Sequence, residues 1–150
     1  MRGCLVGLAW ALISACTGPT APTPAVTSLS AGQWTGMTSQ GMSIAFTVSA
    51  DETLTQILIG YRVNGCSGSQ TFANLEVPTA PQVICASGQC PAGVTSYRAF
   101  NYSSGRLGDG PVTGVNGLFL PGNRAEGRAS FWEYPGCGTE SAVTWTATRR

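Results

Sequence analysis

Two neighbouring stretches decide the fold: SIAFTVS at residues 43–49 and LTQILIGYRVN at residues 54–64. In the first, Ile44, Phe46 and Val48 alternate with small or polar residues, which is the period of a strand with one buried face. The second stretch alternates in the same way, and only a short polar link separates the two. Two such runs joined closely predict a β-hairpin.

The same pattern recurs to the end of the chain, with Gly, Pro, Asn or Asp at intervals of about ten residues. No window has the period of a helix. The sequence therefore predicts an all-β, disulfide-bonded fold, mostly a meander, which is either a small antiparallel β-barrel or a β-sandwich. Trp34, Phe46, Phe119 and Trp145 are expected in its core. The further predicted strands are residues 70–75, 95–102, 112–120, 124–134 and 141–148.

The composition excludes several classes of function. Hydrophobic residues make up 43% of the 150 residues, enough for a core, but charged residues only 10%. All eight cations are Arg and the net charge is +1, so no basic patch for nucleic acid is expected. His is absent, which removes Ser-His-Asp and Cys-His catalysis and His-ligated metals. We therefore expect a non-enzymatic protein without cofactor or metal.

The first sixteen residues look like an export signal. The apolar run at 4–13 is too short to span a bilayer, which takes about 20 residues, but has the length of a signal-peptide core. The string Leu12-Ile13-Ser14-Ala15-Cys16 then resembles the lipobox of bacterial lipoproteins. That resemblance implies cleavage after Ala15, a diacylglycerol thioether on Cys16 and, because Thr17 is not Asp, the outer membrane where the cell has one. The alternative is an ordinary secretory signal that leaves a free thiol.

This interpretation divides the chain into three segments. Residues 1–15 form the lipoprotein signal peptide, residues 16–30 the lipidated Cys and a Pro/Thr-rich tether, and residues 31–150 a single β domain. The tether carries no charge, and its prolines favour an extended chain that reaches roughly 40 Å.

The cysteine count agrees with lipidation. One of the six Cys leaves with the signal peptide, and lipidation of Cys16 leaves an even number that can all pair. Among the three possible pairings we predict Cys66–Cys137 and Cys85–Cys90. A zinc site is the rival interpretation, but no His is present and the spacing of Cys85 and Cys90 is wider than a metal knuckle.

The start of the β domain, GQWTG at residues 32–36, resembles that of calycin-like barrels such as lipocalins and avidins. The resemblance implies that Trp34 closes one end of a barrel. More broadly, residues 32–148 resemble a small exported domain that recurs in bacterial proteins of unknown function, which implies no activity. The segments that carry this second resemblance are Ile44–Val48, Gly65-Cys66-Ser67-Gly68, Gly117-Leu118-Phe119, Cys137 and Val143–Ala147.

Four side chains are candidates for ligand binding: Tyr102, Arg128, Trp132 and Tyr134. If Phe131 is in the core, the alternation of a strand places Arg128, Trp132 and Tyr134 together on the outer face. Outward aromatics beside Arg can stack on a sugar or on a protein partner. The alternative is that they cover a sheet edge or one end of a barrel.

The carboxylates and serines give little support for a catalytic site. Asp51, Glu52 and Asp109 look like solvated turn residues. The serines near Gly68 and Gly105 have no evident general base, so a loop role is expected. A hydrolase would need two carboxylates brought together by the fold, or a buried Ser with an unexpected base.

The sequence thus predicts a lipoprotein that is anchored in the membrane of the bacterial cell envelope through Cys16. Its β domain is expected to be non-enzymatic and envelope-associated or binding, with an envelope protein or a glycan as partner and no nucleic acid. A small-ligand or glycan-binding barrel and a secreted hydrolase are the alternatives. An apolar pocket with a few polar groups would favour the ligand-binding barrel, and an interior filled by side chains would favour interaction with a protein.

Overall fold

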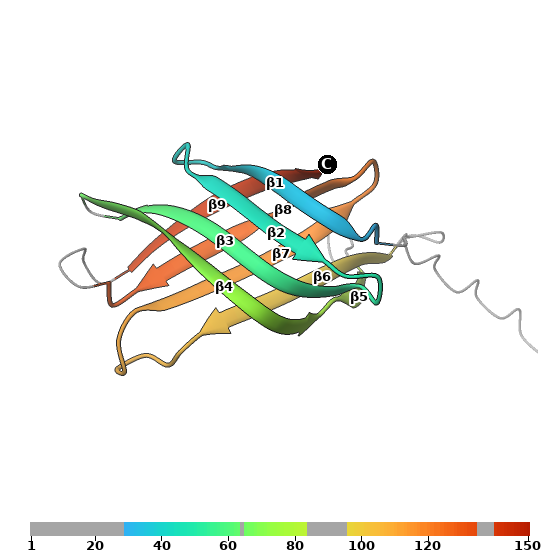
Figure 1. Cartoon of the computed structure of the whole chain (residues 1–150). Helices are drawn as coiled ribbons and strands as arrows, with labels where there is room; N and C mark the ends of the chain where they lie inside the picture. Colours follow the sequence, from blue (N-terminus) through green and yellow to red (C-terminus); the bar gives the residue numbers. More distant parts are fainter. Residues whose placement is uncertain (1–28, 64, 84–95, 135–139) are drawn as a thin grey trace, which may run out of the picture.

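The computed structural model describes residues 29–63, 65–83, 96–134 and 140–150. The regular structure in these ranges is all β-strand, in one antiparallel sheet that curls into a nearly closed barrel (Figure 1). The strands are β1 (Gly32–Thr38), β2 (Ser43–Val48), β3 (Thr53–Val63), β4 (Cys66–Pro78), β5 (Ala80–Val83), β6 (Ser96–Ser104), β7 (Val112–Leu120), β8 (Arg124–Trp132) and β9 (Glu140–Arg149).

The order of strands in the sheet is β4-β3-β2-β1-β9-β8-β7-β6-β5. Each pair along it joins strands that follow one another in the chain, except that β1 pairs with β9 and so brings the two ends of the domain together. The predicted all-β antiparallel meander is confirmed, and of the two architectures left open the barrel is the one found. No helix in the described part of the chain is long and apolar enough to cross a membrane.

The hairpin predicted from residues 43–64 is formed by β2 and β3. Ile44 pairs with Ile59 and Phe46 with Ile57, and all four side chains are buried. The apolar alternation of both strands thus faces the barrel interior, because a strand whose side chains alternate can bury only one face.

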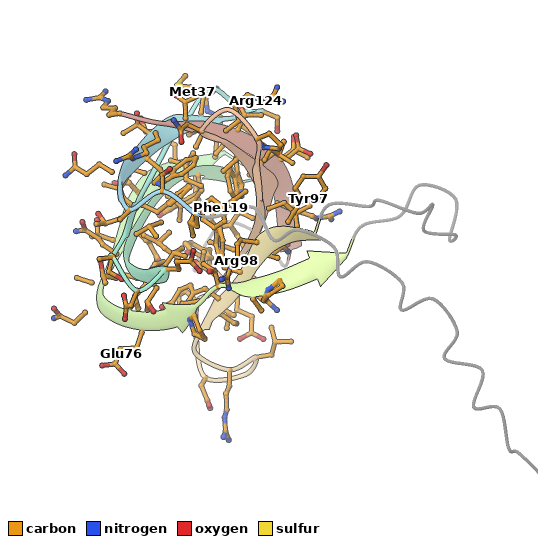
Figure 2. The ribbon with its side chains drawn as sticks, turned by 90° about the vertical axis from the view of Figure 1, so that its right-hand side faces the viewer. Met37, Glu76, Tyr97, Arg98, Phe119 and Arg124 are labelled. Carbon is orange, nitrogen blue, oxygen red and sulfur yellow. The ribbon has the colours of Figure 1, made fainter. Side chains whose placement is uncertain are left out.

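Aromatic rings fill the interior. Trp34 stacks on Phe46 at a centroid distance of 5.7 Å, and Phe119 meets Trp34 edge-on at 5.1 Å. Phe100 and Trp145 continue the cluster, with their centroids 6.1 Å apart. In Figure 2, Phe119 points inward whereas Met37 and Arg124 point away from the barrel. The predicted core residues are therefore confirmed.

The barrel closes at a joint between β4 and β5. These two strands are one extended run interrupted at Thr79; β4 pairs with β3, and β5 pairs with β6. Farther along, β4 and β6 meet through side chains, with the rings of Phe72 and Tyr102 5.0 Å apart. We call this contact between β4 and β6 the seam.

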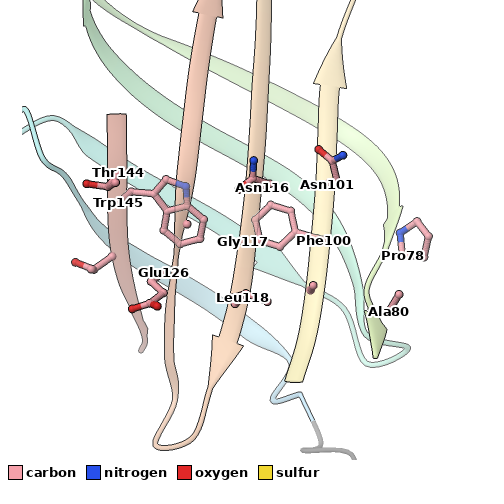
Figure 3. Close-up of a pocket in the computed structure, with 13 residues that line it drawn as sticks. Pro78, Ala80, Phe100, Asn101, Asn116, Gly117, Leu118, Glu126, Thr144 and Trp145 are labelled. Carbon is pink, nitrogen blue, oxygen red and sulfur yellow. The ribbon is translucent and has the colours of Figure 1, made fainter. Parts of the chain in front are cut away.

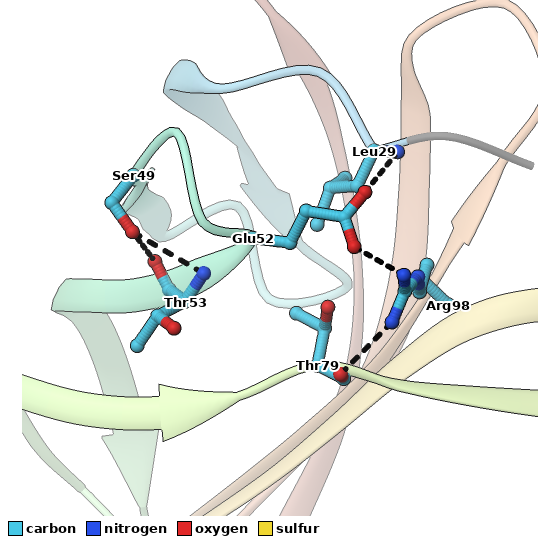
Figure 4. A network of polar contacts seen from close by, with 6 residues as sticks. All are labelled: Leu29, Ser49, Glu52, Thr53, Thr79 and Arg98. Carbon is cyan, nitrogen blue, oxygen red and sulfur yellow. Dashed lines mark hydrogen bonds and ion pairs between the residues drawn. The ribbon is translucent and has the colours of Figure 1, made fainter.

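A polar network crosses the barrel beside Thr79 (Figure 4). Glu52, in the β2–β3 turn, forms an ion pair with Arg98 of β6 and accepts a hydrogen bond from the backbone N–H of Leu29 at 3.2 Å. Arg98 also donates to the carbonyl of Thr79 at 3.3 Å. Glu52 lies in a turn as predicted, but the expectation that it is simply solvated is wrong, because the turn places its half-buried carboxylate against Arg98 of β6.

Candidate functional site

The four predicted ligand-binding residues divide between the two faces of the sheet. Arg128 is exposed on the outer face of β8, and Trp132 lies half-buried on the same face. Tyr102 points inward to the seam, and Tyr134 is only 5% exposed. The outward placement predicted for Tyr134 is wrong. Strand β8 ends at Trp132, and Glu133 has a left-handed backbone (φ 56°), which breaks the alternation and turns Tyr134 inward.

Tyr134 and its neighbours close one end of the barrel. Its hydroxyl shares a hydrogen bond with the hydroxyl of Thr113, which donates in turn to Gln70 Oε1 at 3.2 Å. The ring of Tyr61 lies edge-on to Tyr134 at 4.8 Å. Burial raises the pKa of Tyr134, against an opposing effect of the Thr113 hydrogen bond, and burial also raises the pKa of Tyr102. Tyr134 thus matches the alternative role of covering one end of the barrel, and Tyr102 that of covering a sheet edge.

A groove of about 910 Å³ lies over β6, β7, β8 and β9, and we call it the outer groove (Figure 3). Its polar lining side chains are exposed and alternate along the strands with core residues, so they belong to the outer face. Asn101 and Asn116 are directly opposite each other, as are Glu126 and Thr146. The polar lining is Asn101, Asn116, Glu126, Thr144 and Thr146, and its apolar lining includes Pro78, Ala80 and Leu118.

Two glycines beneath this groove make room for a tryptophan ring on the inner face of the sheet. Gly117 and Gly127 face each other across β7 and β8, and Gly127 is also opposite Trp145 of β9. A Cβ at either glycine would lie within 2.6 Å of Trp145 Cζ2. The absence of both side chains lets the indole lie directly against the backbone of β7 and β8. Trp145 therefore packs in the core, beneath the part of the sheet that forms the floor of the outer groove.

Trp145 has an unpaired polar atom. The side chain is 2% exposed, and its indole Nε1 is buried without a hydrogen-bond partner among the described residues. Trp34, the other buried Trp of the core, differs because its Nε1 donates to the carbonyl of Ser30 at 3.3 Å. Buried donors are almost always paired, so this indole is an exception among the described residues.

The predicted outer pair, Arg128 and Trp132, lies beside this groove. Arg128 is opposite both Asn116 and Thr144, which line it. Trp132 lies over Gly114, where a Cβ would meet its ring at 3.0 Å. The sequence prediction missed the two asparagines and the outward threonines of β9. The paired glycines in the middle of two strands were the available signal, since such glycines mark close approach of a ligand or of another group.

A second groove, of about 350 Å³, continues over β1, β8 and β9. It shares Glu126 and Thr146 with the outer groove. Its rim includes Met37, which is 54% exposed on the outer face of β1. The two grooves together cross the outer face from β6 to β1.

The cysteine predictions fall mainly outside the described residues. Cys66 begins β4 and packs against the core, whereas Cys16, Cys85, Cys90 and Cys137 lie outside the described ranges. The two disulfides and the lipid anchor stay predictions. Within the described ranges, no three acidic or Cys side chains are grouped so that they could hold a metal ion.

Comparison with known proteins assigns no family to the chain. No protein-family model matches it, and no curated protein or solved structure is significantly similar to it.

Proposed function

We propose that the protein is a lipid-anchored component of the bacterial cell envelope whose barrel is a non-enzymatic binding domain that uses its outer face. One observation carries the binding part of the proposal: aromatic side chains fill the interior, whereas hydrogen-bonding side chains line a large groove outside it. By the criterion set out above, an interior filled by side chains favours interaction with a protein on the outer face over a ligand held inside the barrel.

The anchor part rests on the sequence. The string at residues 12–16 fits a lipobox, and two or three acyl chains on Cys16 would hold the protein at the membrane without a spanning helix. The Pro/Thr tether would place the barrel clear of the lipid headgroups. In the structure the chain enters the barrel at Leu29, which Glu52 holds beside β6.

A hydrolase receives less support. Of the serines near Gly68 and Gly105, Ser104 has a structural contact: its Oγ accepts a hydrogen bond from the backbone N–H of Thr113 at 2.9 Å. Glu52 is occupied by Arg98, and Glu133 accepts from the backbone N–H of Gly108 at 2.7 Å. These carboxylates hold turns and strands in place, which supports binding rather than catalysis.

The test is the intact mass of the mature protein from a bacterial membrane fraction, with and without reduction. We expect a chain that begins at Cys16, carries diacylglyceryl and acyl increments, and gains four hydrogens on reduction, two for each disulfide. The Cys16→Ser variant should lose the lipid increment and leave the membrane fraction. An unmodified wild-type chain in the soluble fraction would contradict the anchor.

A further inference from the structure

We infer that the end of the barrel where the chain enters at Leu29 contacts anionic lipid headgroups through three arginines, Arg124, Arg149 and Arg150, which we call the basic cluster. This inference rests on the proposed function, because the lipid anchor on Cys16 is what would bring this end of the barrel to a membrane. The basic cluster would add an electrostatic contact to the anchor and give the barrel a preferred orientation on the membrane.

The basic cluster is assembled where the two ends of the domain meet. Strand β1 begins at Gly32 and pairs with the end of β9. Arg149 Nε lies 3.2 Å from the position that a Cβ would take at Gly32. The backbone N–H of Arg149 donates to the carbonyl of Asn123 at 3.0 Å, and Arg124 is the next residue. The paired strands therefore hold the three arginines around the start of β1.

The charges of the basic cluster are not neutralised by the protein. All three side chains are exposed. Arg150 Nε donates to the hydroxyl of Thr35 at 3.1 Å, which positions the guanidinium group and leaves its charge in place. None of the three forms an ion pair within the described part of the chain, whereas Arg98 at the same end of the barrel pairs with Glu52. The three guanidinium groups are therefore available to bind phosphate groups outside the protein.

The exposed acidic side chains of this end lie on its other side. Asp51 is in the β2–β3 turn and Glu76 is near the end of β4. In the sheet, β4 is separated from β8 by β3, β2, β1 and β9. Figure 2 looks along the barrel and shows Arg124 and Glu76 on opposite sides of it. The half of this end over β8, β9 and β1 is therefore basic, although the net charge of the chain is only +1.

A lipid surface is the partner that these observations favour. The tether would join this end of the barrel, and not the opposite end, to the acylated Cys16. Arg side chains are attracted to anionic headgroups within a Debye length, about 8 Å at physiological salt. The tether limits the distance from the membrane to roughly 40 Å and permits shorter distances, at which the basic cluster can act. Three cations are few for a nucleic acid, whose partners often contact about 6–10 phosphates.

The experiment uses the mature chain with Cys16→Ser, which has no lipid, so that only the affinity of the protein surface is measured. The chain is sedimented with vesicles of phosphatidylcholine and phosphatidylglycerol in equal amounts, and with vesicles of phosphatidylcholine alone. We expect binding to the anionic vesicles that weakens as salt rises, and none to the neutral ones. Three arginines bind more weakly than a single acyl chain, so this variant should still wash out of a membrane fraction.

Matched variants locate the contact. Replacing the whole basic cluster, by Arg124→Gln, Arg149→Gln and Arg150→Gln together, should abolish measurable binding, because each Arg near an anionic surface strengthens binding about fivefold. A control triple variant removes the same charge from exposed positions away from this end and should weaken binding a few-fold at most; it combines Arg62→Gln, Arg106→Gln and Arg128→Gln. Unfolding midpoints check that both variants fold, and Arg124→Gln alone, expected to bind about fivefold more weakly, replaces a triple variant that does not.

Three results would overturn the inference: no binding to anionic vesicles at low salt, equal binding to neutral vesicles, or equal weakening in the two triple variants. The anchor is tested separately, by the intact mass of the wild-type chain. A lipidated wild type whose Cys16→Ser form ignores anionic vesicles would contradict the basic cluster and leave the proposed function standing. An unlipidated wild type that binds anionic vesicles would contradict the anchor and support the basic cluster.

Discussion

At the scale of single residues, two glycines allow neighbouring strands to approach each other closely. A Cβ at Gly36 would lie 1.8 Å from the carbonyl oxygen of Thr146, and one at Gly127 would lie 2.0 Å from that of Asn116. In both cases the obstacle is backbone of the neighbouring strand, which cannot turn aside as a side chain can. Only a residue without a Cβ can occupy these two positions while the strands stay at this distance.

The first prediction concerns Gly127. Gly127→Ala should lower the free energy of unfolding by about 3 kcal/mol, because the strands β7 and β8 must separate to admit the methyl group. Gly114→Ala on β7 is the control: its Cβ would meet only the ring edge of Trp132, at 3.0 Å, and the loss should stay below about 1 kcal/mol. Denaturant unfolding with disulfides intact measures both, and equal losses would show that the backbone contact does not matter.

Single residues also show where the alternation of buried and exposed side chains along a strand predicts burial correctly and where it fails. It correctly placed Trp34, Phe46, Phe119 and Trp145 in the core. It failed at Tyr134, because a single left-handed residue, Glu133, shifts the alternation by one position. Nothing in the local sequence marks that residue, since a Glu seldom adopts such a backbone.

At the scale of elements, strands with an apolar face were predicted closely and strands at the barrel's joint were not. Residues 112–120 are predicted and observed as one strand, β7. Strand β4 runs over 66–78 rather than 70–75, and β5 was not predicted at all. The side chains of β4 are exposed or half-buried. Pro81 lies within β5, where a Pro is tolerated because β5 is at the edge of the sheet.

The second prediction belongs to the joint between these strands. Glu52→Gln should lower the free energy of unfolding by about 1 kcal/mol, because Arg98 would keep its half-buried charge without its ionic partner. Glu76→Gln, on an exposed position of β4, should change it much less. Unfolding at low and high salt measures both, and a loss in Glu52→Gln that does not shrink with salt would argue against an ionic contribution.

At the scale of the whole molecule, Tyr102 and Tyr134 should make the free energy of unfolding depend on pH in the alkaline range. The folded state raises the pKa of Tyr102 and Tyr134 above the ordinary value of 10.0. Each neutral phenol therefore contributes stability that is fully present below about pH 10 and is lost as the pH rises through the folded-state pKa.

The third prediction uses Tyr134→Phe to isolate one of these groups. At neutral pH the variant should be about 1 kcal/mol less stable, because Thr113 loses its hydroxyl partner. Its stability should then fall less steeply than that of the wild type as the pH rises above 10. Unfolding midpoints from pH 8 to 11.5 compare the two slopes, and parallel curves would mean that Tyr134 does not carry the dependence.

The sequence by itself determined the all-β antiparallel fold, the hairpin of β2 and β3 and the main core residues, because period-two alternation is a local property. The tertiary structure decided the closure into a barrel, the ion pair of Glu52 with Arg98, and the groove over Gly117 and Gly127. Each of these three features brings together residues that are far apart in the chain. Which residues meet depends on how the sheet twists and on which strands become neighbours. That the indole of Trp145 has no hydrogen-bond partner among the described residues is likewise decided by the tertiary structure, since the partner of a buried donor depends on which strands pack around it.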